Sequence, residues 1–517
     1  MRSIICIRST GLTPPDILPI LMNHRERAAT PSVCFCSMWE RTESWVAIGE
    51  QLAERGLRVF HIVTPSEYRD LCIARGVPAD QILWLRIDEA LAQPLDTDAV
   101  RRIAEYEQRT ALSLKHFLMM DRFLRERPWD EVLRYAAYCF RRIEEFLDLH
   151  RIDFVSGEPT DAHDLVALLI CRATGRYYGA PFDIRFPVQR FAIWNSDVES
   201  SPLCTGAPTT ADVSEEEIAQ ARDVWNQIRE RKRMQFLTEK AKAPGFGKRF
   251  RQSVIRGVAY RSLLRRRHDG HMYGLWDMLT VHKYHMIPVN HRLNRAQWKS
   301  LFELPEEGER FVLFTLNYQP EHSIDVEAPH WTNQYEVAKA LARCLPVDVR
   351  LYVKEHPSAL GLRGPSVLRR FKRLPGVRLI DPRVDSHQLL QRAELVACIT
   401  GTIAMEAAAY GKRAAVLGST FMDGFSTVTL VRHPSEVATL LRTPPPVPDP
   451  ESDIRLVAWI LSNSFEGTIV DRITNPVGLA PQNVLRLADG YERTMRRIAE
   501  GRIACARASM EQSRWPG

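Results

Sequence analysis

The chain has 517 residues, of which 45% are hydrophobic and 26% charged, and its formal net charge is +7 at pH 7. A chain of this length and composition has ample apolar material for a core and is more often built from two domains than from one. It contains no run of eighteen or more apolar residues, which excludes a helix that spans a membrane.

The N-terminal apolar stretch does not predict a secretory signal. Pro14, Pro15 and Pro19 interrupt it, so we expect a cytoplasmic protein whose residues 1–31 are poorly ordered. The ten cysteines follow no metal or disulfide spacing, and reduced thiols fit a cytosolic chain best.

Residues 32–206 alternate between strand-like and helix-like patterns. Four buried strands are expected in this stretch, at Ser32–Cys36, Arg58–Val63, Ile82–Leu85 and Ile152–Ser156. A long amphipathic helical stretch, Val100–Leu149, is broken at Pro128, and a further helix is expected at Asp161–Thr174. This alternation favours a parallel sheet with helices on both faces.

Residues 207–305 are predicted to form a helical, basic connection. Ser214 and Glu217 have the spacing of a capping box at a helix start. Residues 229–267 hold fourteen Lys and Arg against two Glu, which favours either a solvated helical face or attachment to an anionic membrane surface. No nucleic-acid motif accompanies this charge, so we expect no nucleic-acid partner.

Several histidines in the same connection have spacings that resemble metal sites. No cysteine or acidic residue completes a recognised ligand set with them, so we expect no metal here. These histidines are His268, His271, His282, His285 and His291.

Residues 306–442 are predicted to form a second α/β domain. Its expected strands are Phe311–Leu316, Val349–Val353, Val377–Ile380, Leu395–Ile399 and Ala414–Leu417. Residues 443–517 are expected to begin with a Pro-rich linker from Thr443 and to continue as mainly helical sequence, with a disordered tail after about Arg507. The fold class is therefore α/β, with two Rossmann-like doubly wound domains facing across a cleft, a helical insert and C-terminal helices.

In such sheets ligands bind outside the carboxyl ends of the strands. Lys354, His356 and Pro357 directly follow one predicted strand, and an imidazole and an ammonium there suit a phosphate. A loop histidine at a Pro turn is the alternative interpretation of His356.

Thr400, Gly401 and Thr402 join a predicted strand to an Ala-rich helix. Two hydroxyls and an unhindered backbone at a helix start suit phosphate binding, and an ordinary N-cap is the alternative interpretation of Thr402. Glu406, in the first turns of that helix, is suited to accept hydrogen bonds from a ribose diol or to complement the helix dipole. Gln319 and Glu321 follow the strand Phe311–Leu316 and offer polar contacts to a base, sugar or acceptor.

Taken in order, these motifs resemble the capsule polysaccharide biosynthesis family, whose members include the Kdo transferases that build capsule lipid linkers. The resemblance covers about residues 310–420 and rests on Gln319-Pro320-Glu321, Lys354-Glu355-His356-Pro357, Thr400-Gly401-Thr402 with Glu406, Gly411-Lys412 and Val416-Leu417-Gly418. Arg413 stands where the family often has a Pro.

This resemblance implies a GT-B glycosyltransferase fold, a nucleotide-sugar donor held by the C-terminal domain and usually no required metal. It implies that His356 and Thr400–Thr402 hold the donor phosphate and that Glu406 holds the ribose. A CMP-linked donor is one candidate, because a lone His-Pro and a hydroxyl loop suit a single phosphate. The acceptor would be a lipid-linked or polysaccharide precursor.

The first domain is then expected to supply the catalytic carboxylate. Glu158 and Asp161 follow the strand Ile152–Ser156, and either is suited to act as base toward an acceptor hydroxyl. Helix N-capping is the alternative role of Asp161, which makes Glu158 the first choice.

Two other functions fit the same pattern. One is a CDP-glycerol-type glycerophosphotransferase or a sugar-nucleotide epimerase on the same two-domain plan. The other is a non-catalytic protein that binds a lipid-linked glycan or a membrane surface through residues 229–267, at the inner face of the membrane.

Overall fold

The computed structural model describes residues 30–37, 40–110, 112–186, 189–195, 199, 202–230, 286–470, 475–501 and 503. The predictions for residues 1–29, for the basic stretch beyond residue 230, for His268, His271, His282 and His285, and for the tail after residue 507 lie outside these residues. Within them, no helix is both long and apolar enough to cross a membrane.

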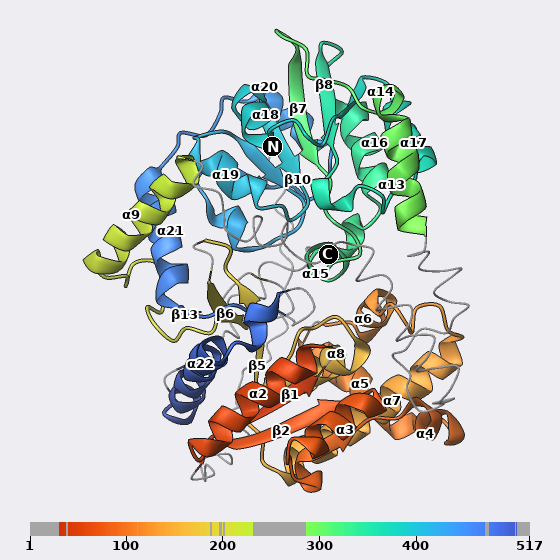
Figure 1. Ribbon diagram of the computed structural model, residues 1–517, viewed down its shortest axis with the longest axis vertical. Coiled ribbons are helices and arrows are strands. Elements are labelled where there is room, and N and C mark those ends of the chain that lie inside the picture. The colour runs from red at the N-terminus through yellow and green to blue at the C-terminus, as the bar shows by residue number, and fades with distance from the viewer. Residues whose placement is uncertain are drawn as a thin grey trace, which may run out of the picture.

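Two sheets organise the chain, one in each predicted α/β domain (Figure 1). The first sheet has seven strands in the order β13-β6-β5-β4-β1-β2-β3. Its strands are β1 (Ser32–Ser37), β2 (Arg58–Val63), β3 (Ile82–Trp84), β4 (Phe154–Ser156), β5 (Tyr177–Asp183), β6 (Arg190–Trp194) and β13 (Ser464–Glu466). Strands β1 to β5 pair in parallel, whereas β6 and β13 are antiparallel to their neighbours.

The helices of the first domain cover both faces of this sheet. They are α2 (Arg41–Glu54), α3 (Ser66–Ala74), α4 (Ile87–Ala92), α5 (Thr97–Thr110), α6 (Leu114–Met120), α7 (Trp129–Leu149) and α8 (Ala162–Thr174). The buried side chains of β1 alternate between two clusters: Cys34 and Cys36 face one, Phe35 the other. This confirms that both thiols lie on the same face of the strand in apolar packing.

Three helices described in the connecting segment are α9 (Glu215–Arg229), α13 (Ile287–Ala296) and α14 (Trp298–Leu301). The predicted capping box at the start of α9 is confirmed, because Ser214 and Glu217 exchange hydrogen bonds with each other's backbone.

The second sheet has six parallel strands in the order β12-β11-β10-β7-β8-β9. They are β7 (Arg310–Thr315), β8 (Val349–Lys354), β9 (Val377–Ile380), β10 (Leu395–Cys398), β11 (Ala414–Val416) and β12 (Val428–Leu430). The helices of this domain are α15 (His322–Asp325), α16 (Gln334–Cys344), α17 (Pro365–Lys372), α18 (Ser386–Arg392), α19 (Ile403–Ala409) and α20 (Glu436–Arg442). All six strands lie inside the predicted range 306–442.

The end of the chain returns to the first domain (Figure 1). After α21 (Pro450–Ser462), strand β13 adds to the edge of the first sheet, and α22 (Pro481–Ala499) packs on α2. The Tyr491 hydroxyl of α22 lies 2.8 Å from Ser156 Oγ at the end of β4. The described part of this stretch is mainly helical, and the short strand β13, which was not predicted, completes a distant sheet.

Two further predictions are corrected. The stretch Val100–Leu149 forms three helices, α5 to α7, rather than one interrupted helix. Strands β5, β6 and β12 were not predicted at all. The two-domain α/β architecture itself is confirmed.

Candidate functional site

The second sheet changes direction between β7 and β10, since β8 and β9 lie on one side of that point and β11 and β12 on the other. Ligands of open α/β sheets bind outside the carboxyl ends of the strands at such a switch point. The segments that leave the sheet here are Asn317–Glu321 and Thr400–Thr402, both of which the sequence singled out.

Hydrogen bonds of Asn317 join these two segments to each other and to the motif Lys354-Glu355-His356-Pro357. Asn317 donates from Nδ2 to Thr400 Oγ1 at 3.0 Å. Its carbonyl accepts from Arg363 Nη2 at 3.1 Å, and Nη1 of the same guanidinium donates to Glu355 Oε1 at 2.6 Å. The strand ends of β7, β8 and β10 therefore share one polar network, as the order of the motifs predicted.

His356 is held at this edge by its neighbours. Its backbone N–H donates to Glu355 Oε1 at 2.9 Å, and its ring meets Tyr318 edge-on with centroids 6.2 Å apart. The imidazole is half-buried, and Pro357 beside it is exposed. Because Glu355 is 1% exposed and bound to Arg363, it fixes the turn that presents His356.

Gln319 and Glu321 shape the loop after β7. Gln319 donates to Asp325 Oδ1 at 3.0 Å and accepts from Gln334 at 3.1 Å. Glu321 accepts from the Ser323 hydroxyl at 3.0 Å and is half-buried. Both side chains thus have structural contacts, and their predicted contacts to a ligand stay predictions.

The two threonines of the β10 segment differ from each other. Thr400 is 1% exposed and its hydroxyl donates to the Ser323 carbonyl while it accepts from Asn317. A hydroxyl has one proton, so the expectation that this group donates to a phosphate is corrected. Thr402 is half-buried and makes no side-chain capping hydrogen bond to α19, so the ordinary N-cap interpretation is also corrected.

Gly401, between them, has room on its Cβ side. An added Cβ would find only ordinary contacts, the nearest with Cys398 Cβ at 3.4 Å.

Lys354 lies inside the domain. It is 3% exposed, and its Nζ donates to the Pro382 carbonyl at 3.1 Å. Burial lowers the pKa of Lys354, whereas the nearby Asp381 and Asp385 favour its charged form. The expectation of a positive charge directly beside a bound phosphate is therefore corrected: this ammonium is a structural group under the site.

Glu406 lies on α19 with its side chain 16% exposed. Burial, and to a lesser extent the negative charge of Asp385, raises the pKa of Glu406 to about 7. Its Oε2 lies 3.3 Å from Nε2 of His387, a residue of α18 that the sequence analysis missed.

The first sheet has its own switch point, between β1 and β4. Arg41 follows β1, Glu158 follows β4, and the two form an ion pair with Nε and Oε1 2.5 Å apart. Glu158 therefore lies at the carboxyl edge of its sheet, and its role as a base stays a prediction.

Asp161 is 3% exposed and occupies the N-cap position of α8. Its side chain makes no capping hydrogen bond, because Asp121 Oδ2 accepts from the first helical N–H, that of Ala162, at 2.8 Å. The position predicted for the helix start is right, but a carboxylate 41 residues earlier does the capping.

A second carboxylate of the first domain was missed. Asp183 ends β5, is half-buried, and accepts from the Ile469 N–H at 2.9 Å. Burial raises the pKa of Asp183 to about 7. The hydrogen bond from Ile469 and the positive charges of Arg41 and Arg185 lower this pKa, but their combined effect is smaller. No sequence motif marks this residue, since the strand before it was not predicted.

The two domains contact each other where β5 and the turn after α6 meet α15. The rings of Phe182 and His322 lie with centroids 4.5 Å apart, and Arg122 pairs with Asp325 at 3.6 Å. In Figure 1, α6 of the first domain lies next to α15 of the second, which agrees with these contacts.

Glu199 joins the domains with its two backbone groups, and its side chain pairs within the first domain. Its N–H donates to Glu327 Oε1 at 3.0 Å, and its carbonyl accepts from the Phe421 N–H at 2.7 Å. Its buried carboxylate pairs with Arg185 at 2.5 Å. The contact between the domains therefore combines these polar contacts with apolar packing, since the Phe421 ring lies against Phe186 and Trp194 of the first domain. The charge of Glu199 acts on Asp183 nearby.

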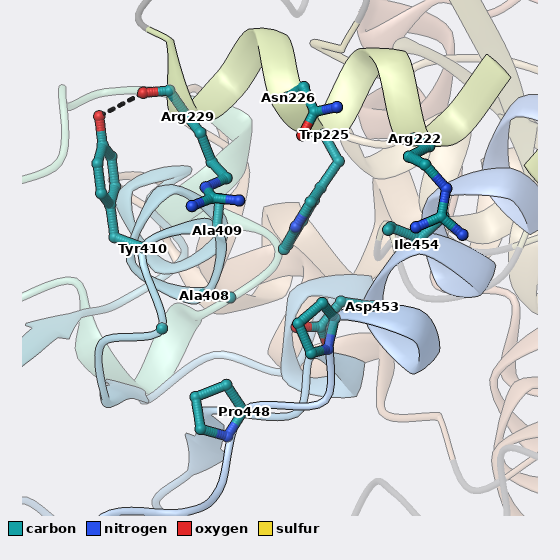
Figure 2. Close-up of a pocket in the computed structure, with 12 residues that line it drawn as sticks. Arg222, Trp225, Asn226, Arg229, Ala408, Ala409, Tyr410, Pro448, Asp453 and Ile454 are labelled. Carbon is teal, nitrogen blue, oxygen red and sulfur yellow. Dashed lines mark hydrogen bonds between the residues drawn. The ribbon is translucent and has the colours of Figure 1, made fainter. Parts of the chain in front are cut away.

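A pocket of about 400 Å³ lies elsewhere, at the far end of α19 (Figure 2). Residues of α9, the end of α19 and the start of α21 line it, among them Arg222, Tyr410 and Pro448. None of the predicted site residues lines this pocket, so it is separate from the switch-point network.

The sequence profile of a family described as "Capsule polysaccharide biosynthesis protein" matches residues 279–447. The resemblance inferred from the motifs is confirmed over this region. The match contains all six strands of the second sheet and the whole network around Asn317, and it leaves the first domain outside.

Solved structures with similarity to the chain include Thermosulfurimonas dismutans KpsC, a β-Kdo 2,7 transferase. It shows 13% identity over 68% of this chain and 89% of that chain, with a TM-score of 0.31. A UDP-GlcNAc 2-epimerase from Neisseria meningitidis bound to UDP-GlcNAc shows 13% identity over 90% and 99%, with a TM-score of 0.22. A UDP-N-acetylglucosamine 2-epimerase from Listeria monocytogenes shows 13% identity over 83% and 91%, with a TM-score of 0.21.

None of the curated proteins compared with the chain matches it. The fold is established by the two sheets of the chain itself.

The contrast between the two threonines gives a test of the network. Thr400→Val is expected to lower the free energy of unfolding by about 2 kcal/mol, because it leaves the half-buried Asn317 amide and the buried Ser323 carbonyl without these hydrogen bonds. Thr402→Val, the matched control, is expected to change it by less than about 0.5 kcal/mol. Urea unfolding followed by circular dichroism measures both; equal losses would contradict the structural role of Thr400.

Proposed function

We propose that the chain is a glycosyltransferase that moves a sugar from a nucleotide-activated donor to a capsule or surface polysaccharide precursor. The observation that carries the proposal is the network around Asn317, which joins three strand ends at the switch point of the sheet that matches the capsule family. That edge is where an α/β domain of this type binds a ligand.

In this proposal the second domain holds the donor. The half-buried imidazole of His356 donates to the donor phosphate and stabilises the charge that develops as the nucleotide leaves. The Thr402 hydroxyl and the backbone N–H groups of the Gly401 segment add donors, while Glu406 accepts the ribose hydroxyls. A CMP-linked donor stays the first candidate, and the site residues form no recognised metal-ligand set.

The first domain supplies the base for the acceptor. We propose Asp183 for this role in preference to Glu158, because Glu158 is already bound to Arg41 whereas Asp183 follows Phe182, which touches the second domain. As the acceptor oxygen bonds to the anomeric carbon of the sugar, its proton passes to the Asp183 carboxylate. A carboxyl group that titrates near neutral pH is well matched to this task.

The acceptor in this proposal is lipid-linked or a growing polysaccharide. Such an acceptor places the enzyme at the inner face of a membrane, with residues 229–267 as the attachment segment.

Donor binding is tested with two variants and a control. His356→Ala and Glu406→Ala are each expected to weaken CMP or UDP binding by at least about tenfold, because each removes a hydrogen bond to a charged or polar part of the nucleotide. His433→Ala changes the exposed histidine of the other His-Pro pair and should leave the affinity unchanged. Isothermal titration calorimetry measures the affinities; unchanged binding in both site variants would refute the donor site.

The base is tested by the pH dependence of turnover at saturating donor. Turnover of the unaltered enzyme should rise as the pH increases through about 7, because Asp183 must be ionised to accept a proton. Asp183→Asn should lower turnover at least about a hundredfold without weakening donor binding. Glu158→Gln should keep the rise near pH 7, and a variant at this position that lost it would transfer the role to Glu158.

A further inference from the structure

Three side chains of the second domain meet between α18 and α19. Asp385 is the N-cap of α18, and its Oδ1 accepts from the His387 N–H at 2.8 Å. The ring of His387 then reaches Glu406 on α19, with Nε2 and Oε2 3.3 Å apart. The cap of one helix thus fixes a histidine that contacts the carboxylate of the next.

The other side of the His387 ring is also held. It meets the ring of Tyr410 edge-on, with centroids 5.9 Å apart. The Tyr410 hydroxyl donates to the Arg229 carbonyl at the end of α9 at 2.7 Å (Figure 2). The imidazole therefore has little freedom to leave Glu406, since a ring fixed from α9 supports it.

Glu406 and His387 are not sealed from water. Their side chains are 16% and 24% exposed, so a ligand hydroxyl can reach the carboxylate while the imidazole stays in contact with it.

The charged and titratable groups around Glu406 come from three elements. His387 and Asp385 approach from α18, the buried thiol of Cys398 lies at the end of β10, and Tyr410 follows on α19 itself. The Lys354 ammonium of β8 lies near Asp385. Asp385 therefore carries the negative charge that acts on Glu406 most directly.

We propose that Asp385 and His387 together position the Glu406 carboxylate for the ribose diol of the donor, because the Asp385 cap fixes the backbone of His387 and the His387 ring contacts the carboxylate. This deepens the proposed function and rests on it. It predicts discrimination against a 2′-deoxy nucleotide, because an ionised carboxylate has enough acceptor sites to bind both hydroxyls of a cis-diol while Oε2 stays in contact with His387.

The chemistry follows from the hydrogen-bond inventory of a carboxyl group. An ionised carboxylate accepts at both oxygens, whereas a protonated one spends one oxygen as a donor. Burial and Asp385 raise the pKa of Glu406 to about 7, so the preference for ribose over deoxyribose should strengthen as the pH increases through that value.

The two neighbours of Glu406 should shift this transition in opposite directions. Asp385→Asn removes a negative charge while its amide oxygen still caps α18, so the transition should move to lower pH. His387→Phe keeps a ring against Tyr410 but removes the hydrogen bond to Glu406, so the transition should move to higher pH. His387→Gln restores a donor and should behave much like the unaltered protein.

The experiment measures the affinities of the full chain for CMP and 2′-deoxy-CMP, and for UMP and 2′-deoxy-UMP, between pH 5.5 and 8.5. The affinity for the ribonucleotide is divided by the affinity for its 2′-deoxy counterpart. In this ratio the effect of phosphate titration cancels, because it is common to both nucleotides. The unaltered protein should show a ratio that rises at least about fivefold with pH. Thermal unfolding of each variant establishes that it is folded.

The outcomes separate two failures. If Glu406→Ala leaves the ribonucleotide affinity and the ratio unchanged, the proposed donor site is wrong and the inference falls with it. In the second case, Glu406→Ala abolishes the preference for the ribonucleotide, but Asp385→Asn and His387→Phe leave the pH of its transition unchanged or shift it in the same direction. The donor site then stands and the inference is overturned. Opposite shifts, with recovery in His387→Gln, support the inference; a merely structural role for His387 would not produce them.

Discussion

The hydrogen bond from Asn317 to Thr400 joins the two strand ends between which the second sheet changes direction. Everything proposed for the donor depends on it. The Asn317 carbonyl accepts a hydrogen bond from Arg363, and Arg363 also donates to Glu355. Glu355 accepts from the His356 N–H and so fixes the turn that carries His356. A buried network of this kind is costly to disturb, since each member satisfies a polar group that would otherwise have lost water without a partner. The loop positions are therefore set by hydrogen bonds between the loops at this edge of the sheet.

The first domain repeats this arrangement with an ion pair. Arg41 and Glu158 face each other across the switch point between β1 and β4. The segment after the second domain also contacts this edge of the first sheet. The Tyr491 hydroxyl is hydrogen-bonded to Ser156, and the Ile469 N–H donates to Asp183. Because β13 and α22 come after the second domain in sequence and pack on the first, the two domains are connected twice. Glu199 adds a polar contact between them.

Sequence reasoning was strongest where a signal is local. The strands Arg58–Val63 and Val377–Ile380 were predicted with their observed bounds, because each is a short buried run between turn residues. Strand β5 was missed since Gly179 and Pro181 both argue against a strand interior. Strand β13 has three residues, and its partner β6 lies far away in sequence, so no local pattern could announce it.

The residues of the candidate site likewise divide into those that local sequence could predict and those that it could not. The motifs that leave β7, β8 and β10 were found because each directly follows a predicted strand. The sequence could not predict that Thr402, rather than Thr400, offers its hydroxyl to a ligand. The Thr400 hydroxyl accepts a hydrogen bond from Asn317, a residue 83 positions away. His387, 19 positions before Glu406, belongs to no motif, and its role emerges only once α18 and α19 pack together.

The most direct test of the donor-site assignment is a hydrogen-exchange map of the full chain with and without bound CMP or UDP. The account predicts slower exchange in peptides that contain residues 317–323, 354–363 and 400–406, since bound nucleotide restrains the three strand ends. Protection confined to α9 and the start of α21, which line the separate pocket, would contradict it and move the nucleotide to the far end of α19.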